Sequence, residues 1–337
     1  MPQEQKIQKG YKGQKTMIFT HSDCDGICAG ALARTRFPNA SLFFTKPVSL
    51  LHDLHETAVP FRPKTMVICD IAITKRHAKE IVNMLSKIGE RSTILYFDHH
   101  VIPKTISIDK ILEAVSTYAH DTAASASEII YRHFQKSLAM ERVWLALYGA
   151  IGDYTENTDF VHERMRNWDR RSIYFEVSTL ILGIKEERFS TYNAKRRIIS
   201  TLASGRNPSD INGLVQAAKS AVTREFEIYK SVKRRAKSFG NAGYVKDLPR
   251  FGFRGPSALF AATITDKPIG LSIHSVRDNL DITARKRSDD PSIQLNQIME
   301  HAAESVGGSG GGHPRAAGAR IPKNMLIKFL EAVDGMV

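Results

Sequence analysis

Five aspartates and two adjacent histidines have the residue types needed to bind metal ions and to do acid–base chemistry. They are Asp23, Asp25, Asp70, Asp98, Asp153, His99 and His100. Carboxylates that lie side by side repel one another and raise each other's pKa, so such a group is costly unless cations neutralise it. Oxygen ligands with some imidazole suit Mn²⁺, with Mg²⁺ as the alternative. Two such ions, about 3.5–4 Å apart, can clamp an in-line displacement at phosphorus. The set therefore predicts two-metal hydrolysis of a phosphate ester.

Short apolar runs predict the strands that position these residues. Runs at 17–19, 65–69 and 93–97 are each followed by acid, and a further strand is expected at 41–45. Helices are expected at 26–37, 74–87, 122–134 and 142–151, an alternation that predicts an α/β fold with a parallel sheet and helices on both faces. Ligands gather outside the carboxyl ends of parallel strands, so these acids should converge on one edge. Asp153 follows a helix in a glycine-containing loop.

Each residue also has an ordinary structural explanation. An Asp after a strand is commonly a helix N-cap, which applies to Asp70 taken singly. His99 and His100 can form a hydrogen-bonded pair on a turn, and Asp153 can cap a helix. The whole set, in this order and at strand ends, favours the metal centre.

The length of 337 residues suits two domains, and 42% hydrophobic and 25% charged residues are ordinary for a protein with a packed core. The breaker cluster 204–209 predicts the start of a link, followed by a long basic helix at 210–238. Strand-like runs at 269–276 and 280–284 and a helix at 293–305 then precede a glycine run at 307–312. We expect a disordered basic arm (1–15), a catalytic domain (16–203), a linker helix (204–239) and a smaller α/β domain with a mixed sheet (240–337).

The net charge of +13 favours a polyanionic partner, with an ordinary basic surface as the alternative. Clusters such as Lys195-Arg196-Arg197 and Lys233-Arg234-Arg235 concentrate this charge. Three cysteines (Cys24, Cys28 and Cys69) indicate a reducing, cytoplasmic compartment. They are better explained as core residues than as a partial zinc site. No apolar run reaches the length of a membrane span, and residues 1–15 lack the apolar core of a signal peptide.

The motifs Asp23-Cys24-Asp25-Gly26, Asp70, Asp98-His99-His100 and Gly152-Asp153 resemble those of the DHH phosphoesterase superfamily. The later segment 310–318 resembles the glycine-rich signature of the DHH-associated substrate-binding domain. The resemblance spans roughly residues 16–322. The superfamily includes RecJ-type exonucleases, nanoRNases, cyclic-dinucleotide phosphodiesterases, phosphoadenosine-phosphate phosphatases and manganese pyrophosphatases.

The resemblance also implies a role for each motif residue. Asp23 would bind one metal and Asp25 the other, with Asp70 bridging both. His99 and Asp153 would complete the second metal's ligands. Asp98 would support the histidines, and His100 would face the scissile phosphate.

One position departs from the family's pattern. Many relatives carry a histidine four residues before the first motif aspartate, where this chain has Phe19. The available histidine is His21, which could reach the first metal or could instead contact substrate.

The glycine run leaves backbone N–H groups accessible and permits positive φ, so it could approach a phosphate closely. A flexible tether is the alternative, but the sequence that follows the run has no place in a tether. The resemblance implies that this domain binds the terminal nucleotide or phosphate. The candidate substrate-binding residues are Gly310, Gly311, Gly312, His313, Arg315 and Arg277, the last expected on a neighbouring strand. The basic helix near 230–237 could guide a strand or simply be solvated.

We therefore expect a manganese-dependent exonuclease that shortens single-stranded DNA, RNA or short oligonucleotides by one mononucleotide at a time. A small-nucleotide phosphatase or phosphodiesterase acting on phosphoadenosine phosphate or a cyclic dinucleotide is the alternative. An inactive scaffold with replication or repair protein partners is the third hypothesis. Its expected signature, loss of the motif acids, is not found in this sequence.

Overall fold

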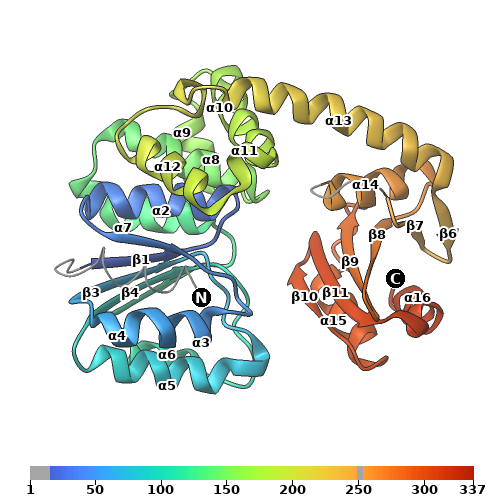
Figure 1. The fold of residues 1–337 in the computed structure, drawn as a ribbon, viewed down its shortest axis with the longest axis horizontal. Coiled ribbons are helices and arrows are strands. Elements are labelled where there is room, and N and C mark those ends of the chain that lie inside the picture. The colour runs from blue at the N-terminus through green and yellow to red at the C-terminus, as the bar shows by residue number, and fades with distance from the viewer. Residues whose placement is uncertain (1–15, 249–252) are drawn as a thin grey trace. The chain divides into compact units, whose positions relative to one another are not determined.

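The computed structural model describes residues 16–248 and 253–337, so the arm expected at residues 1–15 lies outside the described residues. The chain divides into two compact units (Figure 1), the first ending at Lys219 and the second beginning at Ser220. Helix α13 (Leu214–Arg235) belongs to the end of the first unit and the start of the second. Each unit is built on its own sheet.

The first unit contains a five-stranded, all-parallel sheet in the order β2-β1-β3-β4-β5. Its strands are β1 (Thr16–Thr20), β2 (Ser41–Phe44), β3 (Thr65–Cys69), β4 (Thr93–Asp98) and β5 (Thr117–His120). Four of these strands agree with the expected runs. β5 was missed, although its Thr-Tyr-Ala-His sequence combines β-branched and aromatic residues.

Helices cover both faces of this sheet, as predicted (Figure 1). Side chains alternate along each strand, so Ile18 and Val67 enter one core and Phe19 and Ile68 enter the other. The first core is closed by α2 (Cys24–Arg36), α7 (Ala126–Phe134), α8 (Val143–Gly152), α9 (Asp159–Met165), α10 (Arg170–Gly183), α11 (Glu187–Ser190) and α12 (Tyr192–Ala203). The second is closed by α3 (Leu50–Asp53), α4 (Val59–Phe61), α5 (Ala78–Gly89) and α6 (Ile108–Ala114).

The second unit has a six-stranded mixed sheet in the order β10-β11-β9-β8-β7-β6, in which only β7 and β8 are parallel. Its strands are β6 (Lys237–Phe239), β7 (Ala242–Lys246), β8 (Ile269–Val276), β9 (Asn279–Lys286), β10 (Ser309–His313) and β11 (Ala316–Pro322). The predicted α/β class with a mixed second sheet is confirmed. The sheet begins at Lys237, within the segment expected to be linker helix.

Helices also cover this second sheet. They are α14 (Arg254–Ile264), α15 (Leu295–Glu304) and α16 (Leu326–Asp334). Residues of α15 and α16 share a core with Ile282 and Ala284 of β9. α14 packs very close to β8, since a Cβ at Gly270 would overlap the carbonyl oxygen of Ala258. Among the described residues, no helix is both long enough and apolar enough to cross a membrane.

Candidate metal centre and active site

The topology of the first sheet places two of the acidic motifs on either side of one crevice. The chain moves from β1 to β2 on one side and later to β3 on the other, so the strand order reverses between β1 and β3. Ligands in open α/β sheets bind at such a switch point, outside the carboxyl ends of the strands. Asp23 and Asp25 follow β1, and Asp70 follows β3.

Asp23 is both an N-cap and a member of the acidic group. Its Oδ1 accepts the backbone N–H of Gly26 at 3.0 Å, which caps α2. Its Oδ2 lies 2.7 Å from His21 Nδ1, and the same nitrogen is 3.8 Å from Asp70 Oδ2. His21 thus points into the acidic group rather than away from it.

Asp70 has no capping role, because the helical turn that follows begins only at Lys75. Its φ is +57°, a conformation uncommon for residues other than glycine, and its N–H still donates to the carbonyl oxygen of Phe97 at 2.9 Å. Its carboxylate is 3% exposed, and Oδ2 accepts no hydrogen bond within the described structure. Such a buried acceptor carries a desolvation cost, so the geometry at Asp70 fits a cation ligand.

Asp25 is fixed by the first turn of α7. Its Oδ2 accepts the N–H of Ala126 at 2.7 Å, and its Oδ1 accepts the N–H of Ser127 at 3.0 Å. A helix N-terminus stabilises a carboxylate in this way. Each oxygen keeps a second lone pair for another ligand. These amides carry no sequence signal and were not predicted.

His99 and Asp153 approach the group from two further elements. His99 follows β4, and its Nε2 lies 3.3 Å from Asp70 Oδ1 and 3.3 Å from Asp153 Oδ2. Burial lowers the pKa of His99 and so favours the neutral form that ligates metals. Asp153 lies at the end of α8, which reaches α2 closely: a Cβ at Gly152 would be 2.7 Å from Cys24 Cβ. All three cysteines are free and buried in this region's core.

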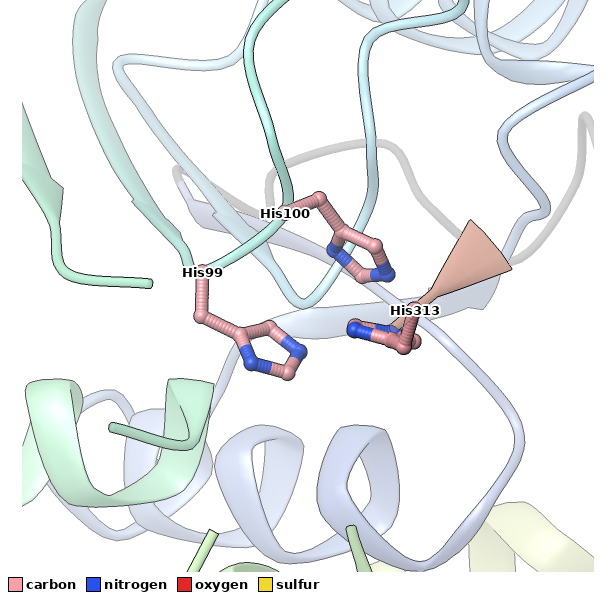
Figure 2. A group of neighbouring side chains, drawn as sticks. All are labelled: His99, His100 and His313. Carbon is pink, nitrogen blue, oxygen red and sulfur yellow. The ribbon is translucent and has the colours of Figure 1, made fainter. Parts of the chain in front are cut away.

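His100 is paired with Asp98, the last residue of β4. Its Nδ1 donates to Asp98 Oδ1 at 2.8 Å, and its ring lies beside that of His99, with centroids 4.6 Å apart (Figure 2). Burial alone would lower the pKa of His100, but the charge and hydrogen bond of Asp98 outweigh it and raise the pKa to about 9. His100 is therefore protonated at neutral pH.

His120 is a neighbour that was not predicted, and neither was its strand. It ends β5, and its Nε2 donates to the carbonyl oxygen of His100 at 2.7 Å. Its ring stacks on Tyr118, with centroids 5.4 Å apart. The backbone on the carboxyl side of His100 is thus held from the edge strand.

The donor set fits divalent cations. Among the described residues of the first unit, ligand atoms lie within 4.8 Å of one another in three groups: His21, Asp23 and Asp70; Asp25, Asp70 and His99; and Asp70, Asp98 and His100. Asp70 belongs to all three. Burial raises the pKa of Asp70, and the charges of the neighbouring carboxylates raise it further. This is the electrostatic arrangement that bound cations would relieve.

A substitution at Gly149 of α8 tests how closely the side chain of Asp25 is packed. A Cβ there would overlap Ser127 Oγ and Asp25 Oδ1. We expect Gly149→Ala to lower the free energy of unfolding by about 1–3 kcal/mol through overpacking. Urea unfolding followed by tryptophan fluorescence measures this, since Trp144 and Trp168 both lie in the first unit.

Gly30→Ala is the matched control for this prediction. Gly30 is also a helical glycine of the first unit, but a Cβ there meets only side-chain methyls, of Thr20 at 3.0 Å and Ile199 at 3.1 Å. Those methyls can shift, and alanine's helix propensity offsets part of the cost. Equal losses in the two variants would contradict a specific clash at Asp25.

In the second unit residues 309–312 of the glycine run belong to the edge strand β10. A Cβ at Gly310 would overlap the carbonyl oxygen of Met299, so this glycine lets α15 approach. Gly311 and Gly312 have φ of +153° and +138°, and of these two only Gly311 has open space at its Cβ position. His313 ends the strand (Figure 2), and Arg315 lies in the turn before β11, 3.4 Å from Asp289.

The expected strand position of Arg277 is wrong. Arg277 lies in the turn between β8 and β9, with φ of +54°. By strand register this turn is roughly 20 Å from the row that holds His313. The arginine on that row is Arg285, because Arg285 pairs with Ala316 and Ala316 pairs with His313. Strand register places Arg285 closer to His313 than Arg277. Residue types alone do not reveal this register.

The fold and the acid-and-histidine centre define a class: a two-unit α/β protein with a metal-compatible site at the switch point of a parallel sheet. Residues 15–151 match the model of the DHH family, N-terminal domain, and residues 258–337 match that of the DHHA1 domain. The chain belongs to the DHH phosphoesterase superfamily. A search of curated proteins found no match.

Solved structures share this fold at low identity. A DHH-domain protein described as a member of a family of ribosomal proteins is 16% identical, with 99% of this chain and 89% of that chain covered and a TM-score of 0.66. The pGpG-specific phosphodiesterase PggH from Vibrio cholerae is 16% identical (96% and 99% covered, TM-score 0.58). RecJ from Thermus thermophilus, solved with Mn²⁺, is 15% identical (98% and 53% covered, TM-score 0.65), so this chain spans about half of RecJ.

Proposed function

We propose that this protein is a metal-dependent phosphodiesterase that shortens single-stranded nucleic acid or short oligonucleotides to mononucleotides. The observation that carries the proposal is the convergence of four carboxylates and three histidines on the buried carboxylate of Asp70. Such an arrangement is costly without cations and suited to phosphate-ester chemistry with them.

The residues divide naturally between two cations, Mn²⁺ or Mg²⁺. His21, Asp23 and Asp70 would hold one. Asp25, Asp70, His99 and Asp153 would hold the other. A pair of bound cations would supply Lewis-acid stabilisation of the charge that develops on the phosphoryl oxygens. This assignment makes His21 a ligand rather than a purely substrate-contacting residue, because its Nδ1 faces Asp23 and Asp70.

His100 would act on the substrate directly. Its Nδ1 donates to Asp98, so Nε2 is the nitrogen that would donate to a non-bridging phosphate oxygen. A charged donor placed where negative charge develops stabilises the transition state more than the ground state. Asp98 orients the ring and keeps it protonated, and His120 fixes the backbone that carries it.

The second unit would bind the nucleotide. Gly311 has a positive φ and no atom at its Cβ position, so a phosphate could approach its backbone closely. His313 and Arg285 lie on one row of the same sheet, two strands apart and about 10 Å from each other. Gly310, Gly312 and Arg315 shape the strand and its turn.

The proposed substrate class is supported by the net charge of the protein and by its similarity to solved structures. The net charge of +13 favours a polyanion. RecJ and the pGpG-specific phosphodiesterase share the fold, and the second of these is specific for the small nucleotide pGpG. Hydrolysis of a small nucleotide is the second candidate, favoured by that likeness. An inactive scaffold is disfavoured because the motif acids are present and converge.

The test uses purified protein with Mn²⁺ or Mg²⁺ and end-labelled single-stranded pentamers of DNA and RNA. One end of each oligonucleotide is blocked, at the 5′ or the 3′ position, and the products are resolved by length. We expect mononucleotides and a ladder that shortens by one residue, with the blocked end revealing the polarity. Hydrolysis of phosphoadenosine phosphate or of a cyclic dinucleotide, with intact pentamers, would replace this proposal by the second candidate.

A further inference from the structure

A basic and aromatic surface lies beside the candidate metal centre, on the first unit. We call it the α12 platform, and it consists of Lys46, Tyr192, Lys195 and Arg196. Lys46 comes two residues after β2, the edge strand that neighbours β1. The other three lie on the first turns of α12. The proposed function assigns no role to these residues.

Lys195 connects the platform to the metal motif. Its Nζ donates to the carbonyl oxygen of Ser22 at 2.7 Å, and Ser22 lies between His21 and Asp23. Lys195 is half-buried, so its stem is packed while its charge is held at the loop that carries the metal motif. A phosphate group near this loop would be attracted to the ammonium group.

Tyr192 provides a ring that is held rigidly from one side. The N–H of Phe44 donates to the Tyr192 hydroxyl at 3.1 Å, and the two rings meet edge to face with centroids 5.2 Å apart. Tyr192 is nevertheless 44% exposed. Arg196 lies over the same ring, with Cζ 6.0 Å from its centroid. A fixed, half-exposed aromatic ring flanked by a guanidinium is the arrangement on which nucleobases stack.

Lys195 interacts with charges of both signs. Burial lowers the pKa of Lys195, the charge of Asp23 raises it, and the charge of Lys46 lowers it. Within residues 16–248 and 253–337, neither Lys46 nor Arg196 forms an ion pair with a carboxylate. Neighbouring cations cost free energy that an arriving phosphate would recover.

We propose that the α12 platform binds single-stranded nucleic acid next to the metal centre, with Lys46, Lys195 and Arg196 on the phosphates and Tyr192 stacked on one base. The inference rests on the proposed function only in taking this strand to be the substrate. It gives the surface a specific ligand: a single strand several nucleotides long rather than a mononucleotide or a dinucleotide.

The first test measures binding without cleavage. A protein carrying Asp70→Asn is titrated onto a fluorescein-labelled single-stranded 12-mer without divalent cation, and anisotropy gives Kd at several salt concentrations. We expect Lys46→Ala and Lys195→Met each to weaken binding about tenfold. Each should also reduce the slope of log Kd against log salt by about 0.7, because one phosphate contact is lost.

Arg197→Ala is the matched control, because it removes the same charge from a neighbouring position of the same helix. Arg197 is exposed and two residues from Lys195, which places it about 200° around α12. It should leave both Kd and salt slope unchanged. If the slope of log Kd against log salt fell equally for Arg197→Ala and the platform variants, the effect would come from net charge alone. That result would overturn the proposal.

Two substitutions at Tyr192 distinguish the loss of base stacking from the loss of folding. Tyr192→Ala should weaken binding about tenfold, whereas Tyr192→Phe, which keeps the ring and loses only the hydroxyl, should bind within about twofold of the parent. Thermal melting confirms that each variant is folded. Equal binding by the alanine and phenylalanine variants would overturn the stacking role.

The last measurement separates this inference from the proposed function. With Asp70 restored, Lys46→Ala and Tyr192→Ala should cleave a 12-mer about tenfold more slowly at limiting substrate and should slow cleavage of a dinucleotide much less. Equal slowing on both substrates would overturn the platform while leaving the proposed function intact. If the parent cleaves no oligonucleotide, the proposed function fails, and the anisotropy comparison alone decides the platform.

Discussion

Replacing Asp70 with asparagine is expected to reduce phosphodiester hydrolysis by at least about 10³-fold, because loss of a single transition-state donor already costs about 10²–10³. Asp70 is the one residue shared by the three groups of potential ligands that lie within the described part of the first unit. Its amide replacement keeps the size and the left-handed backbone, which asparagine tolerates, but removes the charge that both cations would use. Rates with Mn²⁺ and with Mg²⁺, on the same single-stranded pentamer, measure the loss.

The same variant should differ from the parent in stability as well. Without metal, the buried carboxylate of Asp70 is repelled by its acidic neighbours, so Asp70→Asn should raise the melting temperature of the chelated protein by about 2–6 °C. Addition of Mn²⁺ should then stabilise the parent and not the variant, since a ligand stabilises only the state that binds it. Asp109→Asn, at an exposed position of α6, is the control and should behave as the parent does. Unchanged hydrolysis together with parental metal stabilisation in Asp70→Asn would remove Asp70 from the centre.

Much of the first unit could be predicted because buried parallel strands have continuous apolar sequences. The run 65–69 was predicted as a strand followed by acid, and β3 has those bounds. The clustering of the acids then follows from topology alone, because the carboxyl ends of parallel strands lie at one edge of the sheet. β5 was not predicted because it is a short edge strand whose residues are all partly exposed. Its sequence therefore has neither an apolar run nor a clean alternation of apolar and polar residues.

The parts that the sequence could not predict depend on register and on backbone partners. Asp25 is held by two amides of α7, and an amide has no residue type to recognise. Arg285, rather than Arg277, shares a row with His313 only because of how β9, β11 and β10 pair. Lys195 was seen as one residue of a charged cluster, and only the packing of α12 brings it to Ser22.

Replacing Asp98 with asparagine is expected to change the pH dependence of the reaction through His100. In the native protein the pKa of His100 is raised to about 9, against an ordinary value of 6.5. A protonated donor is therefore present at pH 7–8, and its contribution should be lost as the pH rises through about 9. Asparagine removes the charge that raises this pKa and leaves the burial that lowers it. The alkaline limb of kcat should then move down by about two pH units or more, with a loss of at least about tenfold at pH 8.

His100→Gln is the companion variant, because it keeps a hydrogen-bond donor and has no group that titrates. Its kcat should be low across the range, and the alkaline limb should disappear. Profiles of kcat with Mg²⁺ from about pH 5.5 to 10 distinguish the three proteins. An alkaline limb that stays near the native pH in Asp98→Asn, or that persists in His100→Gln, would assign it to another group. Asp98 would then be left with only the task of orienting the ring, for which the hydrogen bond of 2.8 Å is sufficient.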